Sequence, residues 1–281
     1  ASEAQQRRFD GGSQQLTEKQ ADLLGRDKIH LNTPVIHIQN TDKGVKVTTA
    51  KEIFEADAVI LAIPPNMCKT IAYSPPLPRE KSLLFERWTM GHMAKYIFVY
   101  ETPFWRNKGF SGEAISSGEV TAVFDTCLPG GTCALTVFVA ADTGRSFRER
   151  PIEERKKIIM EKLKDYFGPE SLEPKEFLYQ DWSDEKFLGG CPACHLSPGE
   201  VTLYGHLLRS PVGRIFFAGT ETATKWIGYM DGAISAGHRA ADEVKDCFDG
   251  KQRKKPKSSM LFTLAVATGV VIACSIAIRA L

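Results

Sequence analysis

A cysteine that follows two glycines, in Leu188-Gly-Gly-Cys191, has the clearest capacity for chemistry in this sequence. Its thiol is a nucleophile, and two residues without a Cβ let the backbone come close to a bound group. The same cysteine opens Cys191-Pro-Ala-Cys194-His195, which also satisfies the CxxCH pattern of c-type haem attachment and the CxxC pattern of thiol redox sites. Both alternatives fit their surroundings poorly, because no targeting segment opens the sequence and Pro198 follows where a redox motif would begin a helix.

Lys95 is the second residue that could do chemistry. It lies in an alternating apolar stretch that predicts a strand, with Met93, Ile97 and Val99 on its own face. An inward-facing lysine is costly unless it is paired or solvated. The alternative is a surface lysine that points outward.

A strand, a loop of small residues and a helix form the third candidate. The sequence predicts a buried strand over residues 213–219, a loop over 220–224 and a helix from Tyr229 to Phe248. Such a connection presents backbone N–H groups and the positive end of a helix dipole to an anionic or electron-rich cofactor edge. An ordinary strand-loop-helix connection is the alternative.

Hydrophobic periodicity predicts the elements that must position these residues. We expect a short helix at 17–24, a hairpin over 29–38 and 45–49, a strand buried on both faces at 57–65, largely antiparallel strands at 92–101, 120–126 and 133–141, and a helix at 151–167. The order of these elements indicates two domains that are interleaved in the sequence.

An uncharged run near the carboxyl terminus predicts a membrane anchor. From Met260 to Ile278 there are 19 residues without a charge, which reach roughly 28 Å as a helix, close to the thickness of a bilayer core. Basic residues precede the run and only Arg279, Ala280 and Leu281 follow, so the globular part is expected to face the cytosol. A buried core helix and a lipid-anchor signal are weaker alternatives, since a polar face and a small-residue spacer are both missing.

Charge and cysteine content exclude some classes of function. Residues 251–281 hold six Lys or Arg and no acid, which leaves 30 basic against 34 acidic residues in the rest of the chain and gives no support for nucleic-acid binding. Seven cysteines, an odd number in a chain of this size, favour a reducing compartment. No metal site is expected. Because the sequence opens at Ala1 and contains no GxGxxG turn, we expect a fragment that lacks a nucleotide-binding segment.

Three stretches together resemble the monoamine oxidase family of flavoenzymes. They are Gly219-Thr-Glu-Thr-Ala-Thr-Lys-Trp-Ile-Gly-Tyr-Met-Asp-Gly232, Leu188-Gly-Gly-Cys191, and Lys95 followed by Glu101-Thr-Pro-Phe-Trp105. The resemblance implies an α/β and α+β fold in which part of an FAD-binding, glutathione-reductase-like domain is interleaved with a mixed-sheet substrate domain. The implied domains are 1–84 and 185–248 for FAD, 85–184 for substrate, a basic linker at 249–259 and a transmembrane tail anchor at 260–281.

The resemblance also implies roles for individual residues. Cys191 would carry FAD through an S-8α-cysteinyl bond, Lys95 would hold a water against the flavin N5, and Tyr229 would form one wall of an aromatic cage. Pro192 stands where the family usually has the second cage tyrosine, which puts the usual amine preference in doubt. The remaining implied cofactor contacts are Val35, Ala62, Trp182, Gly219, Thr220, Glu221 and Met230, and the implied cavity residues are Phe138, Ala122 and Phe124.

The implied activity is oxidative deamination of primary, and by extension secondary, amines by O2 to aldehyde, ammonia and hydrogen peroxide. The resemblance further implies an outer mitochondrial membrane protein, with a homodimer as one form, and the fragment alone is expected to be inactive. The rival hypothesis from another class is a catalytically inactive, tail-anchored scaffold, which Pro192 favours and which the joint presence of Lys95, Cys191 and Tyr229 opposes.

Overall fold

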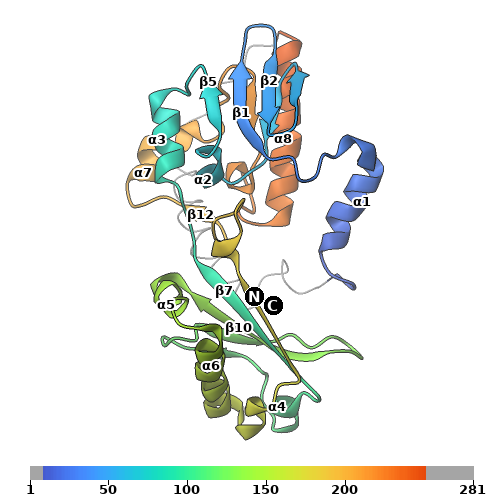
Figure 1. Cartoon of the computed structure of the whole chain (residues 1–281), viewed down its shortest axis with the longest axis vertical. Helices are drawn as coiled ribbons and strands as arrows, with labels where there is room; N and C mark the ends of the chain where they lie inside the picture. Colours follow the sequence, from blue (N-terminus) through green and yellow to red (C-terminus); the bar gives the residue numbers. More distant parts are fainter. Residues whose placement is uncertain (1–8, 251–281) are drawn as a thin grey trace. The chain divides into compact units, whose positions relative to one another are not determined.

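The structure is a computed structural model that describes residues 9–250. Contacts divide these residues into two compact units. The first unit holds residues 9–88 and 196–250, the second holds residues 89–195, and each is treated by itself below (Figure 1). No helix among the described residues is long and apolar enough to cross a bilayer, and the anchor predicted at 260–281 lies outside them.

The first unit is built on a four-stranded sheet of order β3-β2-β1-β5 and a separate parallel pair, β4 and β13. Helix α8 packs against β13. The strands are β1 (Val35–Asn40), β2 (Val45–Thr49), β3 (Ile53–Ala56), β4 (Val59–Leu61), β5 (Ala72–Ser74) and β13 (Ile215–Phe217). The helices are α1 (Gln14–Leu24), α2 (Pro65–Cys68), α3 (Arg79–Arg87), α7 (Glu200–Tyr204) and α8 (Met230–Phe248), with 3-10 turns at Arg26–Lys28, Gly205–Leu207 and Thr220–Thr222.

Two expectations for this unit need correction. The first hairpin strand begins at Val35 rather than residue 29, since residues 29–34 form a turn and irregular chain ahead of it. The strand expected over 57–65 is only three residues long, and Ile60 at its centre is 39% exposed rather than buried on both faces. Within the described residues β4 has β13 as its single strand neighbour, so one side of it lacks a partner.

The second unit is a five-stranded antiparallel sheet of order β11-β7-β10-β9-β8, with helices on one side (Figure 1). The expected strands and helix are confirmed here, and β8 and β11 are additional. The sheet strands are β7 (Met93–Tyr100), β8 (Ala114–Ile115), β9 (Ala122–Asp125), β10 (Cys133–Ala140) and β11 (Glu176–Asp181). A separate antiparallel pair is formed by β6 (Thr89–Met90) and β12 (Cys194–His195). The helices of the unit are α4 (Phe104–Asn107), α5 (Ala141–Phe147) and α6 (Ile152–Phe167), with 3-10 turns at Pro169–Leu172 and Trp182–Asp184.

Helix α6 shows how local signals and burial agree. Pro151 stands at its N-cap, Glu153 lies in the first turn and Lys164 in the last, and Gly168 ends it with a φ of 108°. Its buried face repeats every four residues, as expected for an amphipathic helix, through Arg155, Ile159, Leu163 and Phe167. This face packs on one side of the sheet to form the main core of the unit.

Candidate active site

Burial alternates along β7, and this alternation places Lys95 on the face of the sheet that α6 does not cover. Tyr96 and Phe98 point into the core shared with α6, whereas Met93 and Lys95 point to the opposite side. The sequence prediction for the strand and for the face of Lys95 is therefore confirmed. The side chain of Lys95 is half-buried, which fits an inward rather than a fully solvated lysine.

Strand register gathers the predicted cavity residues around this lysine. Lys95 is directly opposite Phe138 of β10, and Phe138 is directly opposite Ala122 of β9. Phe124 packs edge-to-face on Phe138 with ring centroids 5.6 Å apart. Cys191, from the loop before β12, packs against the same buried cluster. The structure thus brings together five residues that lie up to 96 positions apart in the sequence.

The electrostatic environment joins the lysine to the cysteine. Burial lowers the pKa of Lys95, and negative charge on Cys191 would raise it. The Lys95 ammonium lies 5.3 Å from the centroid of the Phe138 ring, a distance typical of a cation–π contact. A cation beside a thiol and an aromatic wall can stabilise negative charge that develops on a bound electron-rich ring.

The two glycines before Cys191 are required by the packing of the protein itself. Gly189 and Gly190 both have positive φ, and a Cβ on Gly190 would collide with the carbonyl oxygen of Gly91. The Cys191 N–H donates to that same carbonyl oxygen at 2.9 Å, and the Gly91 N–H donates to Ala193 at 3.1 Å. The prediction that the glycines also admit a cofactor ring edge stays a prediction. Pro192, the departure from the family pattern, is exposed.

Trp182 offers an observation on whether a cofactor fits this unit. Its indole Nε1 is buried, and within the described residues it has no hydrogen-bond acceptor. A buried N–H without an acceptor is costly, so such a donor is typical of a site completed by a bound group. The half-buried Lys95 and the thiol of Cys191 give the same unit a cation and a nucleophilic sulfur. These residues fit a flavin.

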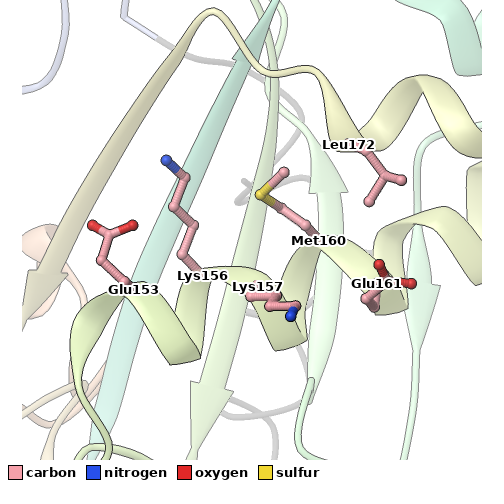
Figure 2. Close-up of a pocket in the computed structure, with 6 residues that line it drawn as sticks. All are labelled: Glu153, Lys156, Lys157, Met160, Glu161 and Leu172. Carbon is pink, nitrogen blue, oxygen red and sulfur yellow. The ribbon is translucent and has the colours of Figure 1, made fainter.

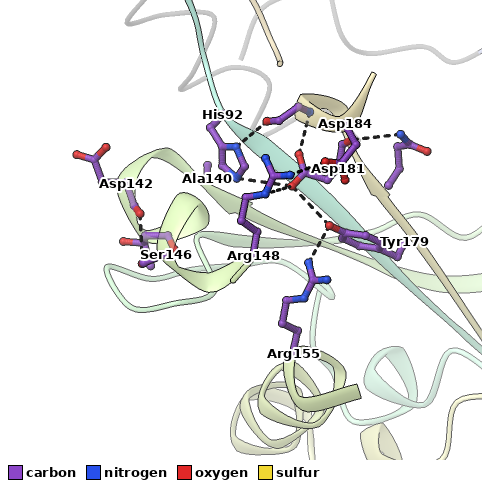
Figure 3. Close-up of polar contacts among 12 residues, drawn as sticks. His92, Ala140, Asp142, Ser146, Arg148, Arg155, Tyr179, Asp181 and Asp184 are labelled. Carbon is purple, nitrogen blue, oxygen red and sulfur yellow. Dashed lines mark hydrogen bonds and ion pairs between the residues drawn. The ribbon is translucent and has the colours of Figure 1, made fainter. Parts of the chain in front are cut away.

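A polar network that the sequence analysis missed holds the turn that contains Trp182 (Figure 3). The Asp181 carboxylate accepts from the Ser183 N–H at 2.9 Å and lies 3.6 Å from Arg148 Nε and 4.0 Å from His92 Nε2. His92 Nδ1 is 2.7 Å from the Ser183 hydroxyl. Burial lowers the pKa of His92, and Asp181 opposes this effect. The only sequence signal was an Asp two residues before a Ser, which is typical of a capped turn.

The first unit carries a second set of predicted residues around the strand-loop-helix connection. Gly219 lies so close to the preceding chain that a Cβ would stand 2.7 Å from the Ile63 carbonyl oxygen. The Thr220 hydroxyl donates to the Tyr229 carbonyl and accepts from the Gly228 N–H, both at 3.0 Å. These bonds fold residues 219–229 into a fixed loop ahead of α8.

Two arginines donate hydrogen bonds that hold the same loop. Arg209 donates to the carbonyls of Thr222 and Ala223 at 2.6 and 2.7 Å. Arg239 of α8 donates to the Phe217 carbonyl at 2.6 Å and to the Thr222 hydroxyl at 2.8 Å. Neither arginine was singled out from the sequence, because arginines on helices and loops most often lie at the surface.

The remaining predicted residues of this unit differ in exposure. Tyr229 is half-buried, its ring packs edge-to-face on Trp226 at 5.5 Å, and burial raises its pKa. Met230 and Ala62 are exposed, Glu221 is buried, and Val35 begins β1. The structure therefore brings the predicted residues together in two sets, one in each unit.

Two other features do not form the site. A surface pocket of about 350 Å³ lies between α6 and the 3-10 turn at Pro169–Leu172, and its lining is mostly charged (Figure 2). It is lined by Glu153, Lys156, Lys157, Met160, Glu161 and Leu172. Within residues 9–250, no group of three or more His, Cys, Asp or Glu side chains is placed to hold a metal ion.

The second-unit sheet with its lysine, phenylalanine and Gly-Gly-Cys thiol, and the strand-loop-helix connection of the first unit, agree with the flavin-containing amine oxidase family. The chain matches the family model described as flavin containing amine oxidoreductase over residues 2–245. The protein therefore belongs to this family.

Individual relatives agree with this assignment. The chain is 43% identical to the flavin-containing amine oxidase B of Sus scrofa over 246 residues, which cover 85% of this chain and 47% of the relative. It is 39% identical to a probable flavin-containing monoamine oxidase A of Dictyostelium discoideum, over 86% of this chain and 54% of the relative. The chain thus spans about half the length of the curated relatives that it matches.

Solved structures show the same mixed α/β fold. The cyclohexylamine oxidase of Brevibacterium oxydans matches with a TM-score of 0.81 and 30% identity, over 85% of this chain and 53% of that one. A putrescine oxidase bound to putrescine matches with a TM-score of 0.79 and 35% identity, over 84% of this chain and 53% of that one.

Proposed function

We propose that the protein to which this chain belongs catalyses the flavin-dependent oxidative deamination of primary and secondary amines by O2. The products are an aldehyde, ammonia or an amine, and hydrogen peroxide. The observation that carries the proposal is the convergence of Lys95, Cys191 and Phe138 on one face of the second-unit sheet. Relatives named as amine oxidases and solved structures named as cyclohexylamine and putrescine oxidases support the same chemistry.

The flavin, when bound, supplies the two-electron chemistry of amine oxidation. Cys191 would hold it covalently through sulfur, and Trp182 Nε1 would donate to it or to its bound water. Lys95 would hold a water near the reacting edge and stabilise negative charge there. The buried wall of Phe138, Ala122 and Phe124 would exclude solvent from the amine.

The loop of the first unit would contribute the rest of the cofactor site. Gly219, Thr220 and Glu221 would approach the cofactor with their backbone, helped by the amino-terminal end of α8. Tyr229 would supply one aromatic wall for the amine. Since Pro192 has no ring with which to complete a cage, we expect weaker selection for arylalkyl amines than a pair of tyrosines would give.

Mass analysis of the full-length protein tests the proposal. A tryptic peptide that carries Cys191 with a flavin adduct, together with peroxide release from benzylamine, would support it. Cys191→Ser should lose the adduct, whereas Cys247→Ser, a matched change of a half-buried cysteine in α8, should keep it. Full-length protein with bound flavin but no peroxide release from any of a panel of primary and secondary amines would favour the scaffold hypothesis.

We also propose that residues 260–281 anchor the protein in the outer mitochondrial membrane with the globular part in the cytosol. The uncharged run from Met260 to Ile278 and the basic residues before it support the anchor. Removal of residues 260–281 should release the protein into the soluble fraction. A truncated protein that stays membrane-bound after a carbonate wash would contradict the anchor. Light scattering of the detergent-solubilised protein tests for the homodimer.

A further inference from the structure

Two cysteines face each other beside the turn that connects β9 to β10. The register pairs Asp125 with Leu135, and it continues so that Cys127 is opposite Cys133. The Thr126 N–H donates to the Ala134 carbonyl at 2.9 Å on one side of this pair, and the Leu128 N–H donates to the Thr132 carbonyl at 2.9 Å on the other. Cys127 and Cys133 therefore occupy a non-hydrogen-bonded position between two hydrogen-bonded pairs.

This position suits a cross-strand disulfide. Residues in a non-hydrogen-bonded antiparallel pair have Cα atoms about 4.5 Å apart and side chains on the same face, and disulfides span Cα separations of about 4.4–6.8 Å. Both cysteines are half-buried, so a small reagent can reach them, and neither is in a disulfide in the structure. At the ordinary spacing of such a pair, the bond can close without a change of register.

Charged neighbours distinguish the two thiols. Burial and a hydrogen bond with Asp125 raise the pKa of Cys127 to about 12, so this thiol stays protonated at neutral pH. Arg106 forms a bidentate ion pair with Asp125 at 2.5 and 2.8 Å, and negative charge on Cys127 or Cys133 further raises the pKa of Arg106. A cation thus lies beside the pair, and because Cys127 is hydrogen-bonded to Asp125, we assign the first attack on an oxidant to Cys133.

We propose that Cys127 and Cys133 form an oxidisable dithiol that a hydroperoxide closes into a disulfide across the hairpin. The Cys133 thiolate attacks the peroxide, takes one oxygen to become a sulfenic acid and releases hydroxide, which becomes water. The Cys127 thiol then displaces the sulfenic oxygen as a second water, with formation of the S–S bond. The two thiols lose two hydrogen atoms in total, and one peroxide is reduced to two waters.

The closed pair would fix the hairpin that carries part of the candidate cavity wall. Ala122 and Phe124 on β9 and Phe138 on β10 belong to the two strands that this bond would join. The proposal does not depend on the proposed amine oxidation, because added hydrogen peroxide serves as the oxidant. If that oxidation is confirmed, its own product would be a local source of peroxide.

The test uses the full-length protein treated with hydrogen peroxide, then unfolded in denaturant and alkylated with iodoacetamide at mildly alkaline pH before digestion. The tryptic peptide over residues 109–145 contains Cys127 and Cys133 and no other cysteine. Without peroxide it should carry two carbamidomethyl groups. After peroxide it should carry none and should have lost the mass of two hydrogens, and treatment with dithiothreitol should reverse the change.

Variants distinguish closure of the Cys127–Cys133 disulfide from oxidation of a single thiol. Cys133→Ser should leave Cys127 alkylated after peroxide, whereas Cys247→Ser, in a helix of the other unit, should leave the loss of both alkylations unchanged. Phenylarsine oxide, which bridges paired thiols, should protect the peptide from alkylation in the wild type but not in Cys133→Ser. Sulfinic or sulfonic acid on Cys133 with Cys127 still alkylated, or a cross-link to a different peptide, would overturn the proposal.

Discussion

Lys95 and Phe138 are direct partners across β7 and β10, with the lysine ammonium 5.3 Å from the centroid of the phenyl ring. The pairing fixes where the cation lies, because Phe138 is itself fully buried between β7 and β9. Burial lowers the pKa of the lysine. The consequence is a positioned cation on the sheet face that also carries Phe138, Ala122 and Phe124.

Replacing this cation should affect reactivity more than folding. We expect full-length Lys95→Met to unfold at the wild-type temperature or slightly above it, since a half-buried ammonium group no longer has to be desolvated. Reoxidation of the reduced protein by O2 should slow by about 10²–10³-fold, the loss typical of one preorganised electrostatic group. Stopped-flow reoxidation measures this, with Lys156→Met on α6 as the control. Equal reoxidation rates in the two variants would show that Lys95 does not take part in the reaction with O2.

Gly190 should tolerate no side chain. An alanine there combines a positive φ with a collision against the Gly91 carbonyl oxygen, whereas Gly199 has a φ of 86° and nothing within 4 Å of a Cβ. Gly199→Ala should cost about 1–2 kcal/mol of unfolding free energy, the strain of a left-handed alanine. Gly190→Ala should cost about 1–3 kcal/mol more from overpacking. Urea unfolding compares the two, and equal costs would show that the chain relaxes around Gly190.

Sequence patterns predicted the features that neighbouring residues determine. They did not predict contacts between residues that are far apart in the sequence. Alternation in residues 92–101 predicted both β7 and the face of Lys95, and Pro151 with Gly168 set the ends of α6. No local pattern reports that Lys95 is opposite Phe138, because register depends on the strand pairing. Likewise, β4 pairs with β13, although the two strands are more than 150 residues apart. The sequence predicted both strands but not that they are neighbours.

Lys81 shows a buried charge that the sequence did not reveal. Its side chain is almost fully buried, and Nζ donates to the carbonyls of Leu207, Leu208 and Ser210 at 2.6, 3.2 and 3.0 Å. Lys81→Met would leave these carbonyls without their donor, which should cost about 1–3 kcal/mol. Thermal unfolding measures this, with the exposed Lys69→Met as the control. A loss no larger than that of Lys69→Met would show that water replaces the ammonium.

Lys81 should also make stability depend on pH. Burial lowers its pKa to about 7 in the folded protein, whereas an unfolded lysine titrates near 10.4. Between these values the unfolded chain binds a proton that the folded protein does not, so the stability contributed by this group rises with pH across the window. Unfolding free energies from pH 7 to 10 should therefore rise less steeply in Lys81→Met than in the wild type. Parallel curves would contradict the lowered pKa.

Asp181 should control the position of Trp182 without touching any ligand. Its buried carboxylate joins Arg148, His92 and the Ser183 N–H, which fixes the turn that contains the tryptophan (Figure 3). Asp181→Asn keeps the shape but removes the charge, and we expect a loss of about 2–3 kcal/mol, below the usual cost of breaking a buried pair because Arg148 is 37% exposed.

A measurement at Trp182 tests the positioning role of Asp181 more directly than the unfolding free energy does. With 5-fluorotryptophan incorporated, the ¹⁹F resonance assigned to Trp182 should shift and broaden in Asp181→Asn as the turn loses its anchor. Asp184→Asn removes the other, exposed carboxylate partner of Arg148 and should leave that resonance nearly in place. Since the two variants change the same arginine by one carboxylate each, only a positioning role of Asp181 predicts a difference between them at Trp182. Equal shifts would mean that Arg148 alone sets the turn.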